Sequence, residues 1–280
     1  MSADRALPRS ARTVLRAGEP VAVRVRVTNT GVVPRSFFAD PRLTTHGTYT
    51  LASQTPGDDQ QKLALNNAAQ WLVPTRSDVL TVTAASDQPV RVATRWGAGL
   101  TGGGPQVLGS TSVTNTSTAT VATERLAPGS WSATASPLRT PGTAPTAGTV
   151  AYTATVRTQL FDPAVTTSTG SLWATALVQA PPGAEVRAAG ALGTAAPTRL
   201  VPGRIADAAS AAAASADDPT TPFAPLTLQP GTSGTIDVVI TPRAEDRGRT
   251  VRGTLDVGSA DTFLDTGDEV ATLPYTYTVS

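Results

Sequence analysis

One pattern occurs twice in this sequence, once near each end. The motif LRAG at residues 15–18 leads into the alternating segment 21–28, and the motif LQPG at residues 228–231 leads into the alternating segment 234–241. The two copies align without a gap at a constant offset, with glycine on glycine and aliphatic residues on aliphatic residues. A short strand, a turn at glycine and a longer alternating strand predict the opening hairpin of a β-sandwich. The repeat therefore predicts an array of β-sandwich modules.

The strands are indicated by apolar residues that recur at every second position. In residues 21–28 four valines face one way, while Arg24 and Arg26 face the other. Residues 250–257 alternate in the same way and place Asp256 on the polar face. Such one-sided burial is typical of antiparallel sheets that have one face on the core and one in water. Pro274 lies on the polar face of the last alternating segment, and because proline cannot donate to a ladder it predicts a sheet edge or a bulge.

These segments predict an all-β fold of tandem antiparallel β-sandwich modules. The predicted divisions are a disordered N-terminus at residues 1–9, a first sandwich at 10–67, a second at 68–160 and a third at 161–280. The stretch from residue 225 onward supplies only three or four strands, so the third sandwich is expected to recruit residues 171–179.

Composition narrows the class of protein. Hydrophobic residues make up 40% of the 280 residues, which indicates a globular chain and not a disordered one. The net charge is only +1 and Lys62 is the single lysine, so the chain lacks the basic stripe that a nucleic acid would need. No apolar run approaches the roughly 20 residues that span a bilayer, so no membrane span is expected.

The cellular compartment stays open on composition alone. The chain has no cysteine, which excludes disulfides and thiolate metal sites and slightly favours a reducing compartment. The first 20 residues lack the basic and apolar segments of a signal peptide. Either the protein is cytosolic or the numbering starts inside a longer precursor.

A catalytic site of its own finds little support. A Ser-His-Asp triad would have to use His46, the single histidine, which lies in a sequence typical of a turn. No Gly-x-Ser-x-Gly elbow supplies a nucleophile, and a Ser-Lys pair would depend on Lys62 in a polar stretch. An exposed histidine is therefore favoured over a catalytic one, and no catalytic residue is assigned.

One group of carboxylates forms the best candidate for a metal site. Asp261, Asp265, Asp268 and Glu269 are hard oxygen ligands dense enough to hold a Ca²⁺ ion between two strands. Their spacing does not match the alternating acidic loop of known calcium motifs. Solvated acidic residues in a turn before a final strand are the simpler interpretation, and no other cofactor is expected.

Aromatic residues offer an alternative binding function. A sugar-binding platform would draw on the four tryptophans, Trp71, Trp96, Trp131 and Trp173. Each lies in or beside a predicted strand, so packing in the core is favoured over a ligand platform. A carbohydrate platform requires at least two of them exposed on one face.

Four arginines fall on predicted polar strand faces or turns. They are interpreted most simply as solvated surface residues, namely Arg35, Arg42, Arg91 and Arg95.

Several stretches in fixed order resemble a known arrangement. They are VTNTG at 27–31 with SFFADPRL at 36–43, WLVP at 71–74, FDPAVT at 161–166 with TGSLW at 169–173, and 228–241 followed by GTLDV at 253–257 and GDEVATLPYTY at 267–277. This set resembles the C-terminal accessory region of secreted subtilisin-family serine proteases of actinobacteria. Scarce lysine beside abundant arginine and alanine suits such a high-GC source.

The resemblance implies fibronectin-III-like or immunoglobulin-like sandwiches trailing a protease domain outside the cell, with a jelly-roll-like middle module. The implied function is non-catalytic, because the subtilisin Asp, His and Ser motifs are absent from this sequence. The region would stabilise, space or target a subtilisin-family protease domain in cis, with protein substrate or cell-envelope polysaccharide as further partners. Two alternatives remain, a carbohydrate or cell-wall binding protein that acts on its own and an enzyme with its own activity.

Overall fold

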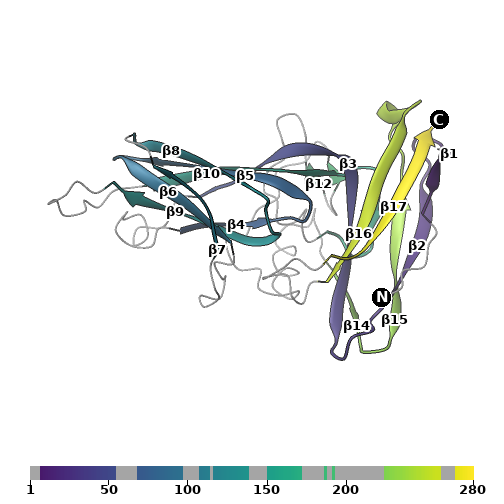
Figure 1. The fold of residues 1–280 in the computed structure, drawn as a ribbon. Helices are drawn as coiled ribbons and strands as arrows, with labels where there is room; N and C mark the ends of the chain where they lie inside the picture. Colours follow the sequence, from purple (N-terminus) through teal and green to yellow (C-terminus); the bar gives the residue numbers. More distant parts are fainter. Residues whose placement is uncertain are drawn as a thin grey trace.

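In a computed structural model, most of the described residues form two β-sandwiches (Figure 1). The structure describes residues 7–54, 68–96, 107–113, 116–138, 150–171, 186–187, 191–192, 224–259 and 269–280. Nearly all of these residues lie in strands or the turns between them, and the one helical element there is the short 3₁₀ turn Ala244–Asp246. The predicted all-β sandwich fold is confirmed. The described part of the chain contains no helix with the length and apolarity to cross a membrane.

The terminal sandwich combines strands from both ends of the chain. Its strands are β1 (Arg9–Leu15), β2 (Val21–Thr28), the first half of β3 (Arg35–Gln54), β11 (Val165–Thr167), β14 (Leu226–Leu228), β15 (Ser233–Ile240), β16 (Thr250–Ser259) and β17 (Glu269–Val279). One sheet has the order β1-β17-β16-β3, with β14 also beside β3, and the other has the order β11-β15-β2. This arrangement, with β1 parallel to the last strand, corresponds to the C-F-G and B-E-D sheets of an immunoglobulin-type sandwich.

The second sandwich is an eight-stranded jelly roll. Besides the second half of β3 it contains β4 (Ala68–Val73), β5 (Ser77–Ser86), β6 (Val90–Trp96), β7 (Val107–Val113), β8 (Thr118–Glu124), β9 (Gly129–Pro137) and β10 (Val150–Phe161). Its sheets have the orders β3-β10-β5-β8 and β4-β9-β6-β7. Numbered from one to eight within the unit, these orders are 1-8-3-6 and 2-7-4-5, which is the double Greek key of a jelly roll. A separate short ladder joins β12 (Val186–Arg187) and β13 (Ala191–Leu192).

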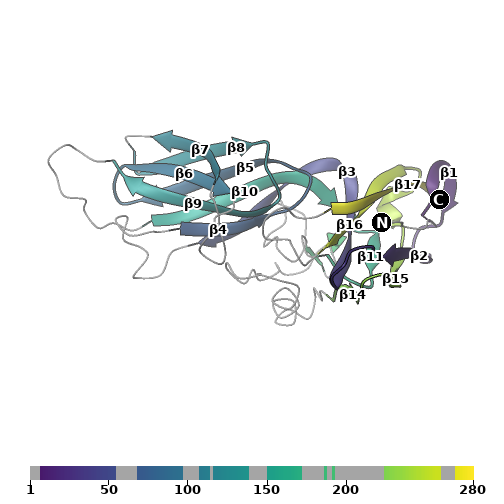
Figure 2. The ribbon, with the colours of Figure 1, turned by 60° about the horizontal axis from the view of Figure 1, so that its bottom comes forward.

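The jelly roll is inserted into the terminal sandwich through β3 and β10. The 20-residue strand β3 pairs with β16 from Phe37 to Leu43 and with β10 from Arg42 to Gln54, so the chain leaves the terminal sandwich on one strand and returns on its neighbour. The jelly-roll strands lie across those of the terminal sandwich, with β3 between the two units (Figures 1 and 2).

This topology differs from the three consecutive modules expected at 10–67, 68–160 and 161–280. Strands of the first and third predicted modules share one core, because β2 pairs with β15 over its whole length and the first half of β3 pairs with β16. The second half of β3, also within the first predicted module, contributes Tyr49 and Leu51 to the jelly-roll core instead. The chain crosses the boundary between the terminal sandwich and the jelly roll twice. The first crossing lies inside β3, and the second lies at the end of β10. The predicted strand at 171–179 lies almost wholly outside the described residues.

The predicted hairpins are wrong. Each copy of the repeat is an arch, in which the chain crosses from one sheet of the terminal sandwich to the other. β1 pairs with β17 and β14 pairs with β3, whereas β2 and β15 pair with each other. Gly18 and Gly231 make the crossings at φ of +79° and +72°, a region that glycine enters without strain. The two strands of each copy belong to opposite sheets of the sandwich, and Leu15 of β1 and Leu228 of β14 pack towards the core that β2 and β15 line.

Two hydrophobic cores result, one in each sandwich. The terminal core is built around Val25, Val27, Phe37, Ile236, Val238, Ile240, Leu255, Val257, Leu273, Tyr275, Tyr277 and Val279. The jelly-roll core is built around Phe38, Tyr49, Leu51, Leu80, Val82, Val92, Val121, Trp131, Tyr152, Val156 and Phe161. Adjacent residues of β3 serve different cores, since Phe37 faces the terminal core and Phe38 faces the jelly roll.

The predicted alternation is confirmed in β2 and β17 and has one informative exception in β16. Asp256 lies on the face expected to be polar, yet it is 3% exposed. The jelly roll covers this face of β16 and β3, which explains the burial. Pro274 pairs with Thr254 of β16 and precedes the stretch from Thr276 onward that β1 borders, so it occupies an edge of the sheet as predicted.

Candidate functional site

Arg42 is the centre of a polar network between the two sandwiches. Its side chain is fully buried, so its interpretation as a solvated surface residue is wrong. Nε donates to Asp40 Oδ2 at 2.6 Å, and Nη1 donates to the carbonyl oxygen of Gln159 at 2.7 Å. The guanidinium carbon lies 4.1 Å from the ring centroid of Phe161, close enough for a cation–π contact. A buried arginine is tolerated here because its charge is paired and its donors find acceptors.

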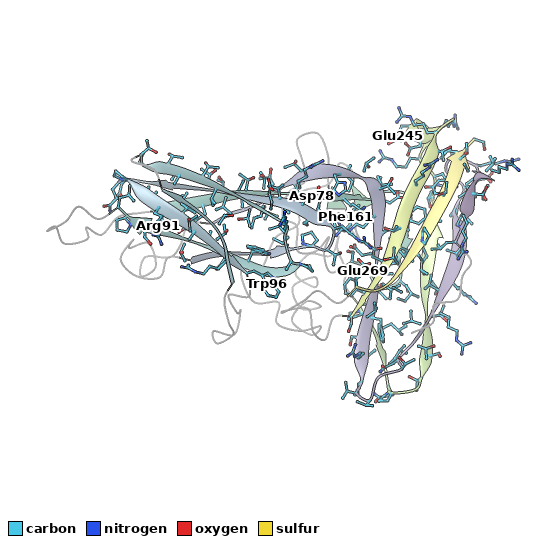
Figure 3. The ribbon with its side chains drawn as sticks, in the orientation of Figure 1. Asp78, Arg91, Trp96, Phe161, Glu245 and Glu269 are labelled. Carbon is cyan, nitrogen blue, oxygen red and sulfur yellow. The ribbon has the colours of Figure 1, made fainter. Side chains whose placement is uncertain are left out.

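The network ties the jelly roll to the terminal sandwich. Arg42 Nη1 and Nη2 also reach Thr158 Oγ1 at 3.3 Å and the carbonyl oxygen of Thr75 at 3.4 Å. Ser171 donates from its hydroxyl to the second oxygen of Asp40. Asp40 and Arg42 come from β3, Thr158 from β10, Thr75 from the β4–β5 turn, and Ser171 from the segment after β11. Phe161 and Glu269 mark this junction in Figure 3.

Asp256 is a charged group of the junction that lacks a hydrogen-bond partner among the described residues. Neither oxygen of its carboxylate accepts a hydrogen bond from a described group, and the nearest cation is Arg76, with Nε 3.7 Å from Oδ2. The pKa of Asp256 is raised to about 6, mainly by burial and then by the nearby charges of Glu269 and Asp40, against the lowering effect of Arg42 and Arg76. Asp40 is the register partner of Asp256 in the β3–β16 ladder, so two buried carboxylates lie on neighbouring strands.

A third buried acid, Asp162, is held from the terminal sandwich. Tyr275 donates its hydroxyl to Asp162 Oδ2 at 2.5 Å, and the backbone N–H of Ala164 donates to Oδ1 at 2.9 Å. Burial raises the pKa of Asp162, and burial together with the Asp162 charge raises the pKa of Tyr275. Gly253 lies under the Tyr275 ring, where a Cβ atom would come within 2.3 Å of it. The missing side chain of this glycine therefore makes room for the tyrosine.

Arg76 forms the ion pairs that cross between the units in the described part of the chain. It donates from Nη2 to Glu269 Oε1 at 2.6 Å, from Nε to Glu269 Oε2 at 3.1 Å and from Nη2 to Thr272 Oγ1 at 3.1 Å. Glu269, one of the four predicted calcium ligands, is thus engaged by a guanidinium. The other three, Asp261, Asp265 and Asp268, lie outside the described residues, so the calcium site stays a prediction. Among the residues that the structure describes, no group of three or more His, Cys, Asp or Glu side chains could hold a metal ion.

His46 lies within β3 and not in the predicted turn. It pairs in register with Gln159 of β10, and its Nε2 is 3.5 Å from Asp78 Oδ2. Arg157 approaches the same carboxylate oxygen at 3.5 Å. The three side chains form a charged group on the outer face of the jelly roll, with Asp78 labelled in Figure 3.

The described tryptophans belong to the jelly-roll core, as favoured from the sequence. Trp131 is 4% exposed and donates from Nε1 to the carbonyl oxygen of Ala127 at 2.8 Å. Trp96 is its register partner, packs partly buried against the same core and donates from Nε1 to the carbonyl oxygen of Pro128 at 3.0 Å. The side chain of Trp71 and the whole of Trp173 lie outside the described residues.

The junction was missed from the sequence because its polar residues carry no signal of burial of their own. Arg42, Asp40 and Asp256 occupy polar positions of alternating strands, where exposure is the ordinary outcome. The SFFADPRL segment at 36–43 does carry a hint, since two adjacent phenylalanines cannot both face one core. At the junction the donors of Arg42 bind acceptors inside the protein, and this arrangement supports a structural role for the junction.

No protein-family model matches this chain, and no curated protein matches it.

Proposed function

We propose that this chain is a non-catalytic accessory region that works outside the cell, in cis with a subtilisin-type serine protease domain. Its role is that of a rigid spacer, which holds the protease at a set position relative to its substrate or to the cell envelope. The resemblance of the ordered sequence segments supports the protease partner, and the joint between the sandwiches supports the spacer.

The observation that carries the proposal is the form of this joint. Flexible tethers between domains are single segments rich in glycine and serine. Here two neighbouring strands, β3 and β10, connect the units, and each contributes to buried structure at the crossing. The network of the buried Arg42 adds hydrogen bonds from β3 to the carbonyl oxygens of Gln159 on β10 and Thr75 in the β4–β5 turn. We infer from this that the network favours one relative orientation of the sandwiches.

The first experiment is to identify the native polypeptide by mass and N-terminal sequence in culture supernatant and cell lysate. The proposal predicts a larger secreted species that contains these 280 residues together with a subtilisin-type domain. A product near 28.5 kDa that starts at Met1 and is confined to the lysate would overturn it.

The spacer role has its own test in the parent enzyme. Replacing this region by a glycine–serine linker should leave turnover of a small chromogenic peptide unchanged, because the protease domain keeps its own chemistry. Cleavage of a large or cell-attached protein substrate should fall. Equal activity of both forms on both substrates would contradict the spacer role.

A further inference from the structure

The angle between the two sandwiches needs a second point of attachment besides the β3–β10 strand pair. Two neighbouring antiparallel strands form a ribbon, and a ribbon can bend and twist about its own axis. The β4–β5 turn supplies a contact away from that ribbon. This turn belongs to the jelly roll, and its residue Arg76 forms ion pairs with Asp256 of β16 and Glu269 of β17.

The backbone of this turn is held in an unusual conformation. Arg76 has a φ of +62°, in the left-handed region that residues other than glycine rarely adopt. The conformation is fixed from β10, since Gln159 donates its N–H to the Arg76 carbonyl oxygen at 3.3 Å and Thr158 donates its hydroxyl to the same oxygen at 3.0 Å. Strained residues of this kind persist where the surrounding structure determines them, and they cluster at functional elements.

The side chain spans the gap to the terminal sandwich. Its guanidinium forms a bidentate pair with the Glu269 carboxylate and donates a hydrogen bond to Thr272. It also lies 3.7 Å from the Asp256 carboxylate. Bidentate arginine–carboxylate pairs restrict direction as well as distance, because both donors must be aligned at once. Asp256 adds a buried carboxylate that Arg76 approaches from the turn, in addition to the charge of Arg42 on the neighbouring strand β3.

We propose that Arg76 is a latch that sets the angle between the jelly roll and the terminal sandwich by clasping Glu269 and Asp256. The inference deepens the spacer role proposed above and rests on it for its biological purpose. Without the latch the two units stay folded and connected by β3, β10 and the Arg42 network, but their relative orientation spreads over a wider range.

The chain contains no cysteine, so spin labels can be placed at will. Thr120 of β8 and Thr235 of β15 are exposed, one in each sandwich, and Thr120→Cys with Thr235→Cys gives a distance distribution across the joint by pulsed electron paramagnetic resonance. The otherwise unaltered chain should give one narrow distribution. Arg76→Ala and Glu269→Gln should broaden it, and the double variant should broaden it no further than either single change.

The sharpest variant is Arg76→Gly. Glycine accepts a positive φ without strain, so the turn should keep its shape and the melting temperature should stay the same or rise, while the clasp is lost. A broadened distribution with an unchanged melting temperature is the expected result. An unchanged distribution, or broadening that comes only with a large drop in melting temperature, would overturn the latch.

The matched control is Arg157→Ala. Arg157 is also a half-exposed arginine in an ion pair, but its partner Asp78 belongs to the same sandwich. The control should leave the distribution narrow, and equal broadening in it would also overturn the proposal. Because the measurement uses the isolated 280-residue chain, a narrow latch-dependent distribution stands even if no protease parent is found. A broad distribution in the unaltered chain would overturn both the latch and the rigidity of the spacer, whereas the protease partner is tested separately by the mass and N-terminal sequence of the native polypeptide.

Discussion

Arg24 and Asp237 occupy equivalent positions in the two copies of the sequence repeat, and they are also register partners in the β2–β15 ladder. Arg24 Nε lies 3.3 Å from Asp237 Oδ1. A residue can pair with its own counterpart only where a local two-fold axis passes, so the two arches are related by such an axis. The two arches also make equivalent hydrogen bonds. The N–H of Gly18 donates to the carbonyl oxygen of Pro242, and the N–H of Gly231 donates to that of Asn29, each at 2.8 Å.

The charge pair at this axis should favour pairing of β2 with β15. Asp237→Arg places two arginines opposite each other and should lower the free energy of unfolding by about 0.5–1 kcal/mol, a modest amount because both side chains are largely exposed. The charge-swapped double variant, Arg24→Asp with Asp237→Arg, should recover most of the loss. Urea unfolding at low salt measures both, and failure of the swap to recover stability would show that the pair does not act through charge.

Removal of the buried Arg42 guanidinium should lower the free energy of unfolding far more than removal of an exposed guanidinium. Arg42→Ala leaves Asp40 charged and buried without its partner, and we expect a loss of about 3–5 kcal/mol of unfolding free energy. Arg91→Ala, at an exposed position of β6, should change stability by about 0.5 kcal/mol or less. Denaturant titration of the two variants distinguishes the burial seen here from the surface location expected from sequence.

Asp256 should make stability depend on pH in a direction opposite to that of an ordinary paired carboxylate. Its pKa rises from 3.8 to about 6 on folding, so its contribution is fully present below pH 4 and is lost as the pH rises through 6. Asp256→Asn removes the titration and should be more stable than the parent chain by about 1–3 kcal/mol at pH 7.5. Below pH 4 the two should be nearly equal.

Thermal melts from pH 4 to 8 measure the difference in stability between Asp256→Asn and the parent chain. Asp87→Asn, in the exposed β5–β6 turn, is the control and should run parallel to the parent chain. An Asp256→Asn variant that is less stable than the parent at pH 7.5 would contradict the buried, unpartnered state of this carboxylate.

Gly253 should tolerate no side chain. The Cβ atom of Gly253→Ala would meet the Tyr275 ring at 2.3 Å and the Arg42 carbonyl oxygen at 2.5 Å, and we expect a loss of about 2–3 kcal/mol or more. Gly18→Ala meets nothing within 4 Å and is opposed only by its positive φ, so a loss of about 1 kcal/mol is expected. Equal losses in a calorimetric comparison would show that the close approach of Tyr275 is not present in solution.

Local sequence was enough to find most of the long strands and to orient them. Alternation in 21–28 and 271–279 predicted which residues are buried, because the side-chain period of a strand is the same whatever it pairs with. The strands β5, β7 and β8 were not singled out, since small or threonine side chains occupy many of their positions and leave little contrast between the two faces. For the candidate site, Glu269 was named for its chemistry, but its partner Arg76 is far away in sequence.

The amino-acid sequence by itself determined the all-β class, the faces of the strongly alternating strands and the equivalence of the two repeats, because these depend on neighbours within a few residues. Only the tertiary structure decided that each repeat is an arch, that both chain ends share one sandwich and that a jelly roll is inserted within it. It also decided that Arg42, Asp40 and Asp256 are buried. Their strand positions have the same local pattern as exposed ones, and the covering surface comes from strands that lie far from them in the sequence.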